Sequence, residues 1–271
     1  MSSSELVPVL PPFAEETIHR FLRAHVRDAS AKGVVIGLSG GLDSSLSLRL
    51  AVDALGPRRV VGLVEPDDRF PTPRLEEIQR YARRLGVRTR VIPIAPVEEA
   101  LVPLLPDPRD RVARGNVKAR IRMILNYAQA RDLSSLVVGT GNKSEILLGY
   151  FTKYGDGGAD LLPLGDLYKT QVREMARRVG IPTAIRRRPP SADLWEGQTD
   201  EGELGITYEL ADRILLGMER LWDPPEIARR LRIPLATVER IAGRVREHRH
   251  KRRLPPIPKL GGRTVGLDWR D

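Results

Sequence analysis

Apolar residues along the chain fall into two patterns that alternate. Short, mainly aliphatic runs, which are typical of buried strands, occupy positions 34–38, 60–64, 89–94 and 136–138. Around them, apolar residues recur every three or four positions, which predicts amphipathic helices over 11–28, 44–56, 74–85, 116–130 and 170–179. Because parallel strands are joined by crossover helices, this alternation predicts an α/β fold with a parallel sheet and right-handed connections.

In other segments the apolar residues do not recur at the spacing of a helix or a strand. Residues 1–10 are expected to be unstructured, and prolines interrupt the pattern between 95 and 110. The glycine-rich stretch 151–160 is predicted to be a loop that follows a short helix at 144–150. The segment 186–206 is long and irregular, as lids, binding loops and disordered regions are.

Two short helices with a tight turn are predicted over 224–247, and a basic tail follows them. A helix pair of this kind can bind DNA through its second helix. That helix carries Glu239 and Arg240 but has no obvious set of base-reading Asn or Gln side chains. We therefore favour two packed helices with solvated arginines, and a DNA-binding regulator is the alternative.

Composition narrows the class of protein. The 271-residue chain is 41% hydrophobic, which is enough for a buried core. It has neither a run of about 18 apolar residues nor a basic and apolar leader, so we expect a cytoplasmic protein without a membrane partner. The absence of cysteine excludes a cysteine nucleophile and thiolate metal sites. The formal charge of +10 favours nucleotides or nucleic acid, although heat adaptation or genome composition would explain it equally well.

The stretch from Gly37 to Ser44 reads Gly-Leu-Ser-Gly-Gly-Leu-Asp-Ser and lies between a predicted strand and a predicted helix. Its paired glycines allow a tight turn and the close approach of a ligand, and Ser39 and Ser44 offer hydroxyl groups. The amide groups at the start of the following helix favour an anion such as a phosphate. Asp43 repels a phosphate directly but can hold a Mg²⁺ ion that bridges to it.

This stretch matches neither the Walker loop nor the Gly-x-Gly-x-x-Gly dinucleotide turn. A strand-to-helix turn that uses glycines for geometry alone is one interpretation of it. It also resembles the SGGxDS loop of the ATP pyrophosphatase superfamily, whose members cleave ATP between the α and β phosphates. In that superfamily the loop grips the pyrophosphate leaving group.

Further motifs in the same order make the chain similar to the ammonia-dependent NAD synthetases, a family of N-type ATP pyrophosphatases. They occupy positions 115–120, 140–145, 151–160 (FTKYGDGGAD), 190–194, 203–206 and 250–252. The resemblance implies a Rossmann-like open parallel sheet with helices on both faces, of the adenine nucleotide alpha hydrolase-like type, and a helical C-terminal extension.

The resemblance also implies a single domain over 1–271. Its expected parts are an N-terminal helix and arm at 1–30, an ATP-pyrophosphatase core at 31–185, a loop or lid at 186–206, C-terminal helices with the HKRR substrate segment at 207–258, and a tail at 259–271.

Members of this family convert deamido-NAD, ATP and ammonia into NAD, AMP and pyrophosphate, the final step of NAD biosynthesis. They work as homodimers with the dinucleotide near the subunit interface. The resemblance therefore implies a ligase that forms a C–N bond through an adenylated intermediate. A carboxylate resists ammonia because oxide would have to leave, whereas an adenylated carboxylate loses a stable phosphate. This chemistry calls for cations around phosphates rather than a covalent catalytic residue.

Positions that match the family motifs imply roles for single residues. Mg²⁺ is assigned to Asp43 and Glu145. ATP is assigned to Gly37, Leu38, Ser39, Gly40, Gly41, Leu42, Asp43, Ser44, Thr140, Lys169 and Ser191. Deamido-NAD is assigned to Arg120, Lys153, Asp160, His250 and Lys251. Lys153 is also suited to the charge that develops around the reacting carboxylate.

Two stretches depart from the family pattern. After Thr140 the chain reads Gly-Asn-Lys-Ser-Glu where other members read Asp-His-Ala-Ala-Glu, which keeps Glu145 in place and leaves the role of Lys143 open. The loop at 65–73 matches poorly, so no adenine contact is carried over.

The nitrogen source follows from what the chain lacks. Glutamine-using relatives carry an additional amidase domain with a cysteine nucleophile, and this chain has neither the length nor the cysteine. Free ammonia, or ammonia from a separate donor protein, is expected instead. A tRNA-modifying ATP pyrophosphatase is the alternative with the same phosphate loop, but the 151–160 motif has no reason to exist there. We expect no nucleic-acid partner.

Overall fold

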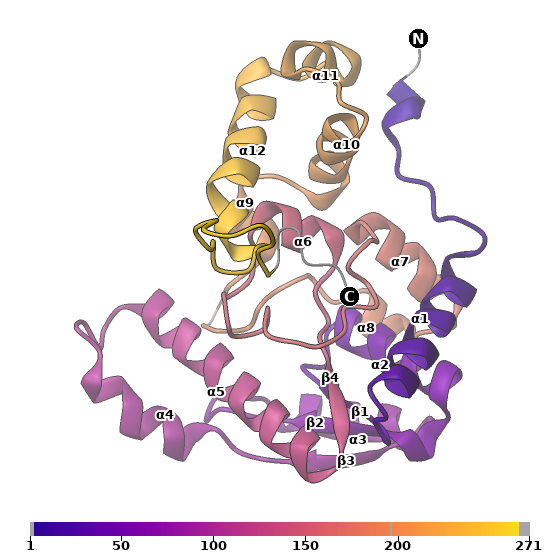
Figure 1. Ribbon diagram of the computed structural model, residues 1–271, viewed down its shortest axis with the longest axis vertical. Coiled ribbons are helices and arrows are strands. Elements are labelled where there is room, and N and C mark those ends of the chain that lie inside the picture. Colours follow the sequence, from indigo (N-terminus) through magenta and orange to yellow (C-terminus); the bar gives the residue numbers. More distant parts are fainter. Residues whose placement is uncertain (1–2, 196, 266–271) are drawn as a thin grey trace.

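The centre of the fold is a four-stranded parallel sheet, seen in a computed structural model that describes residues 3–195 and 197–265 (Figure 1). Its strands, in the order β3-β2-β1-β4, are β1 (Gly33–Gly37), β2 (Val60–Val64), β3 (Arg88–Val91) and β4 (Ser135–Val138). Strand β1 pairs with both β2 and β4, so Val35 lies opposite Val61 and Val137. The predicted parallel α/β fold is confirmed, and the strand before the predicted phosphate loop, Gly37 to Ser44, lies inside the sheet.

Helices cover both faces of the sheet, as predicted. Val34 and Ile36 of β1 pack on one face, and Val35 packs with Ala130 on the other. The first face is covered by α1 (Ala14–Asp28), α2 (Leu42–Leu55), α3 (Thr72–Arg84) and α7 (Lys169–Arg178). The second face is covered by α5 (Arg111–Asp132). Successive strand residues point to opposite faces, so β1 and β2, which are buried on both sides, are apolar throughout. The edge strand β3 is mostly exposed and carries Arg88 and Arg90.

Caps and prolines explain where the helices differ from the apolar pattern. The Asp110 carboxylate accepts hydrogen bonds from the N–H groups of Val112 and Ala113, so α5 begins before the predicted 116–130. The segment 95–110, whose prolines concealed any pattern, contains α4 (Ala95–Leu101) and the 3₁₀ turn η3 (Val102–Leu104). In both elements the proline lies in the first turn, where its missing N–H costs nothing. Pro182 likewise precedes α8 (Thr183–Arg186).

The expectation that residues 1–10 are unstructured is wrong for a part of that segment. A 3₁₀ turn, η1 (Ser3–Leu6), buries Leu6 completely among the C-terminal helices. Leu10 is buried in the main core, and Glu5 pairs with Arg230 at 2.6 Å. Two isolated leucines hold this segment, so it shows no helical or strand period.

The C-terminal helices form a second hydrophobic cluster above the sheet in the view of Figure 1. They are α9 (Asp200–Leu204), α10 (Tyr208–Glu219), α11 (Pro224–Leu231) and α12 (Leu235–Glu247), and the 3₁₀ turn η4 (His248–Lys251) follows α12. Leu148 of α6 (Lys143–Leu148) joins the same cluster. Ile227, Val238 and Ile241 are fully buried in it, so the predicted helix pair over 224–247 is a packing unit.

Arginines that a DNA-binding interpretation would need are engaged within the chain. Arg240 donates to the carbonyls of Leu204 and Gly205 at 2.7 and 3.1 Å. Arg244 donates to the Leu148 carbonyl at 2.9 Å. These bonds favour the packed-helix interpretation over the regulator.

The segment 186–206 begins with the last residue of α8 and contains α9, and its other described residues form neither helix nor strand. The division of the chain into functional parts stays a prediction, and residues 266–271 of the expected tail lie outside the described residues. Where the chain is described, no helix is both long enough and apolar enough to cross a lipid bilayer.

Truncation of Leu6 tests the packing of the N-terminal arm. We expect Leu6→Ala to lower the free energy of unfolding by about 2–4 kcal/mol, because a fully buried leucine leaves a cavity. Val9→Ala, at a residue that is 76% exposed, is the control and should change stability by less than about 0.5 kcal/mol. Urea denaturation measures both, and equal stability of the two variants would contradict the packing.

Candidate functional site

A cavity of about 470 Å³ opens at the carboxyl ends of the strands, where α/β sheets bind their ligands. Its walls come from the phosphate loop, the end of β4, α5, α6 and the irregular segment 186–206. The predicted site residues that line it are Gly37, Leu38, Ser39, Gly41, Leu42, Asp43, Ser44, Thr140, Glu145, Lys169, Ser191 and Lys251. Motifs that are far apart in the sequence therefore meet in one place.

The phosphate loop is held in shape by its own hydroxyl groups. The Gly41 N–H donates to Ser39 Oγ, and the Ser44 hydroxyl donates to the Gly41 carbonyl, both at 3.2 Å. Gly40 has a φ of +77°, which a residue with a side chain adopts only with strain. Gly41 is the N-cap residue of α2 and has no side chain to cap it, so the first amide groups of this helix are available to an anion.

Two carboxylates and one ammonium group converge beside this loop. Lys169 Nζ donates to Asp43 Oδ2 at 2.7 Å and to Glu145 Oε1 at 3.0 Å. Asn142 Nδ2 donates to Asp43 Oδ1 at 2.9 Å. The lysine assigned to ATP thus bridges the two carboxylates assigned to the metal, and it neutralises part of their charge.

A capping box at the start of α6 fixes the position of Glu145. Asn142 Oδ1 accepts from the Glu145 N–H at 3.1 Å, and Glu145 Oε2 accepts from the Asn142 N–H at 3.2 Å. The Asn-x-x-Glu spacing in the sequence is a signal that could have predicted this cap. Lys143, whose role was open, pairs with Glu219 of α10 at 2.8 Å and so joins α6 to the C-terminal helices.

A fully buried carboxylate, Asp212 of α10, joins the two helices that carry Glu145 and Lys169. It accepts hydrogen bonds from the Ser144 hydroxyl, and from the N–H and hydroxyl of Thr170 at 2.9 and 2.8 Å. Ser144 Oγ accepts from the Lys169 N–H at 2.9 Å. Because Ser144 and Thr170 adjoin the two site residues, Asp212 fixes both helix starts. No motif indicated it, since its partners are distant in the sequence.

Burial controls the protonation of the site. It raises the pKa of Glu145 to about 7, although the Lys169 ammonium opposes the shift. Burial lowers the pKa of Lys169, but Asp43 and Glu145 outweigh burial and leave that pKa far above its usual value. Asp200 lines the same cavity, and burial raises its pKa as well. Lys169 therefore stays positively charged, and it favours the ionised forms of Glu145 and Asp200, which burial disfavours.

Arg188 is a cavity residue that sequence motifs did not indicate. Its guanidinium donates to the Gly40 carbonyl and pairs with Glu77 of α3 at 2.6 Å. A positive charge from the irregular segment thereby lies at the phosphate loop. Three consecutive arginines occupy 186–188, and charge alone cannot tell which of them points inward.

A buried carboxyl group lies at the end of β2, in the loop for which the resemblance implied no contact. Asn126 Nδ2 lies 3.5 Å from Glu65 Oε2, and Arg122 donates to the Glu65 carbonyl at 3.1 Å. Burial raises the pKa of Glu65 to about 8, and the charge of Arg122 opposes this shift. Near neutral pH the group therefore carries a proton that it can donate within the cavity.

Ser191 and Lys251 reach the cavity from different segments. Ser191 Oγ donates to the Gln198 carbonyl at 2.7 Å, which closes a turn within 186–206. Lys251 Nζ donates to the carbonyls of Gly149 and Phe151 at 2.7 and 2.9 Å. Lys251 thus joins η4 to the start of the 151–160 loop.

Some predicted site residues do not line this cavity, namely Gly40, Arg120, Lys153, Asp160 and His250. Arg120 is exposed on α5 and donates to the Lys153 carbonyl at 3.3 Å. Asp160 accepts from the Tyr127 hydroxyl of α5 at 3.0 Å. His250 is exposed in η4. The residues assigned to deamido-NAD therefore lie mainly on the outer surface of the chain.

Known proteins resemble this chain in sequence and in fold. The family model described as NAD synthase matches residues 14–255. An NH(3)-dependent NAD(+) synthetase from Methanosarcina acetivorans is 44% identical over 250 residues, which cover 91% of this chain and 98% of the relative. A solved NMN synthetase from Francisella tularensis is 33% identical, with a TM-score of 0.80 over 96% of this chain and 100% of that one. An NH3-dependent NAD synthetase from Campylobacter jejuni is 27% identical, with a TM-score of 0.76 over 96% and 100%.

Replacement of Asp212 should loosen both helix starts. We expect Asp212→Ala to lower the free energy of unfolding by about 2–4 kcal/mol, because donors of Ser144 and Thr170 lose a buried acceptor. Asp166→Asn, at a carboxylate whose side chain is 97% exposed, is the control and should cost less than about 0.5 kcal/mol. Urea-induced unfolding measures both. A loss at Asp212 no larger than the control would show that the network contributes nothing.

Proposed function

The chain belongs to the NAD synthase family, and we propose that the cavity at the carboxyl ends of its strands is the active site for that family's reaction. The protein has NH3-dependent NAD synthetase activity, which amidates deamido-NAD with ammonia and ATP as the final step of NAD biosynthesis. One observation supports the location: Asp43, Glu145 and Lys169, from three different helices, converge beside the phosphate loop.

The reaction needs positive charge and positioning. Transfer of AMP onto the nicotinate carboxylate builds negative charge on the α phosphate and on the departing pyrophosphate. The free amides at the start of α2 would hold the phosphates, while Lys169 and Arg188 supply positive charge beside them. Ammonia then attacks the acyl carbon, and AMP leaves with the electrons of the broken C–O bond. No side chain has to become covalently attached.

Asp43 and Glu145 fit a magnesium ion. Mg²⁺ prefers hard oxygen ligands, and these two carboxylates come from separate helices yet share one cationic partner, the Lys169 ammonium. We assign them as its ligands, and the bound ion would neutralise charge on the ATP phosphates. Lys169 would then contact ATP, with Thr140 and Ser191 at the same wall.

Residues assigned to deamido-NAD lie partly outside the cavity, which a second subunit would explain. Arg120, Ile124 and Tyr127 follow the spacing of one helix face on α5, and Ile124 is 58% exposed. We propose that this face packs against a second copy of the chain, so that the dinucleotide extends from the cavity toward the interface. Lys153, whose carbonyl accepts from Arg120, lies on the same side.

Ammonia is the proposed nitrogen donor, either free or released by a separate protein. The amidase domain of glutamine-using relatives needs a cysteine nucleophile, and the chain contains no cysteine. The acceptor has a second candidate, nicotinate mononucleotide, because the solved relative with the TM-score of 0.80 is described as an NMN synthetase. A mononucleotide is shorter and would not need the outer residues of α5.

Product analysis tests the active site. Purified protein with ATP, MgCl2, deamido-NAD and ammonium should form NAD and AMP in equal amounts. Asp43→Asn and Glu145→Gln should each lower kcat/KM by about 100-fold or more, because each removes charge needed around the phosphates. Asp68→Asn, at an exposed carboxylate that does not line the cavity, is the control and should keep full activity.

Chromatography of the nucleotides separates the outcomes. A higher kcat/KM for nicotinate mononucleotide than for deamido-NAD would reassign the acceptor and leave the phosphate site intact. Full activity of both carboxylate variants would place the reaction elsewhere.

A charge on the outer face of α5 tests the homodimer. We expect the wild-type chain to sediment as a dimer and Ile124→Glu to sediment as a monomer, because an interface would have to bury an unpaired carboxylate. The variant should also raise KM for deamido-NAD more than KM for ATP. Leu221→Glu, at a residue that is 92% exposed after α10, is the control. A monomeric wild type in analytical ultracentrifugation would refute the interface.

A further inference from the structure

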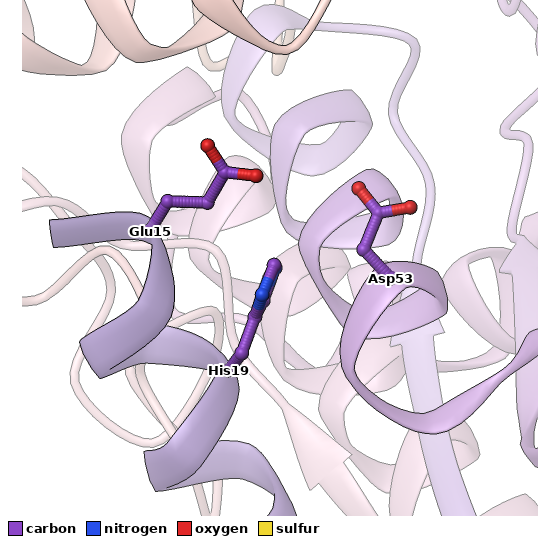
Figure 2. Close-up of side chains that lie close together, drawn as sticks. All are labelled: Glu15, His19 and Asp53. Atoms are coloured by element: carbon purple, nitrogen blue, oxygen red, sulfur yellow. The ribbon is translucent and has the colours of Figure 1, made fainter. Parts of the chain in front are cut away.

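A histidine and two carboxylates meet between α1 and α2, away from the cavity. Glu15 and His19 are one helical turn apart on α1, and Asp53 lies near the end of α2. One potential ligand atom from each residue lies within 4.8 Å of the other two. Figure 2 shows the His19 imidazole projecting between the two carboxylates.

The burial of His19 gives an independent indication of a ligand. The residue is only 9% exposed, and its Nε2 atom is buried without a hydrogen-bond partner. An unpaired buried nitrogen costs stability, and native structures contain few of them. The imidazole is directed toward Glu15 and Asp53, whose oxygens are the other donors of the group. A bound cation would satisfy the nitrogen and the two carboxylates at once.

We propose that Glu15, His19 and Asp53 bind a divalent transition-metal ion of the Zn²⁺ type. One imidazole nitrogen with two carboxylate oxygens suits Zn²⁺ and its first-row neighbours, whereas Mg²⁺ and Ca²⁺ prefer oxygen ligands alone. Three protein ligands leave room for water, which the exposed position of Asp53 allows.

A neighbouring arginine limits the strength of this site. Arg49 Nε donates to Asp53 Oδ2 at 2.6 Å, which leaves Oδ1 of the same carboxylate for a metal. The guanidinium also repels a cation, so the affinity is lower than that of a closed four-ligand zinc site.

The ion would join the N-terminal helix to the helix that begins at the phosphate loop. Asp43 and Asp53 lie ten residues apart on α2, which separates them by about 15 Å along the helix. The proposed site is therefore distinct from the carboxylates assigned to Mg²⁺. It would stabilise the packing of α1 on α2 and take no part in the reaction.

Calorimetric titration with ZnCl2 tests the site. Chelator-treated full-length protein is titrated in excess MgCl2, so that Zn²⁺ does not fill the Asp43 and Glu145 site. We expect one Zn²⁺ per wild-type chain. Glu15→Gln and Asp53→Asn should each weaken binding at least about 10-fold, since each replaces an anionic ligand by a neutral one of the same size. Glu16→Gln, at the adjacent residue whose carboxylate pairs with Arg23, is the matched control and should bind as the wild type does.

Thermal unfolding gives a second readout that does not depend on activity. ZnCl2 at about 100 times its Kd should raise Tm by roughly 5–10 °C in the wild type and in Glu16→Gln, and by much less in Glu15→Gln. Glu15 is half-buried, so this variant keeps the proposal testable even if a substitution of buried His19 prevents folding. Absence of Zn²⁺ binding to the wild type at millimolar concentration would overturn the proposal. So would Zn²⁺ binding that is unchanged in both Glu15→Gln and Asp53→Asn.

Discussion

The double ion pair of Lys169 with Asp43 and Glu145 is the interaction on which the rest of the site depends. Two carboxylates that face one cavity repel each other, and burial strengthens this repulsion. The Lys169 ammonium lies between them, and the Lys169 side chain is only 4% exposed. Without the two carboxylates the ammonium would be a buried charge with no partner, so the three groups stabilise one another. The same three groups therefore stabilise the fold and present the charges that a nucleotide and its cation need. A nucleotide or cation that binds here must therefore replace ionic contacts that Lys169, Asp43 and Glu145 now make with one another.

Precise placement of these charges comes from helix starts. Asp43 lies in the first turn of α2, Glu145 in that of α6, and Lys169 begins α7. The first amide groups of a helix carry partial positive charge, so α2, which has no side-chain cap, presents an end that favours anions to the cavity, whereas the first amides of α7 already donate to Ser144 and Asp212. Asp212 binds the backbone of α7 and the hydroxyl group of Ser144 on α6, and it comes from the second hydrophobic cluster. The C-terminal helices thus fix the positions of α6 and α7, although other segments form most of the cavity wall.

The sequence predicted the sheet, most helices and the phosphate loop because each has a local cause. Apolar period, turn glycines and helix starts are encoded within a few residues, and the family resemblance assigned Glu145 to the metal and Lys169 to ATP. Contacts between distant segments have no such local signal: Leu6 anchors the N-terminal arm, Arg188 folds onto Gly40, and Asp212 bonds two helices. The same limit applies to Arg120 on α5, which we assign to deamido-NAD and to a proposed contact with a second copy of the chain.

The basic segment after α12 shows that positive charge in a sequence does not by itself indicate a nucleic-acid partner. Two cations of this segment and one from the last turn of α12 donate to carbonyls at the end of α6: Arg252 to Leu147, Lys251 to Gly149 and Arg244 to Leu148. The last carbonyls of a helix have no partner within it and carry partial negative charge, so cationic donors suit them. Helix α6 presents Glu145 at its other end, and it has only six residues, too few to be stable alone. The charge that resembles a nucleic-acid surface in the sequence therefore serves to fix the helix that carries a proposed metal ligand.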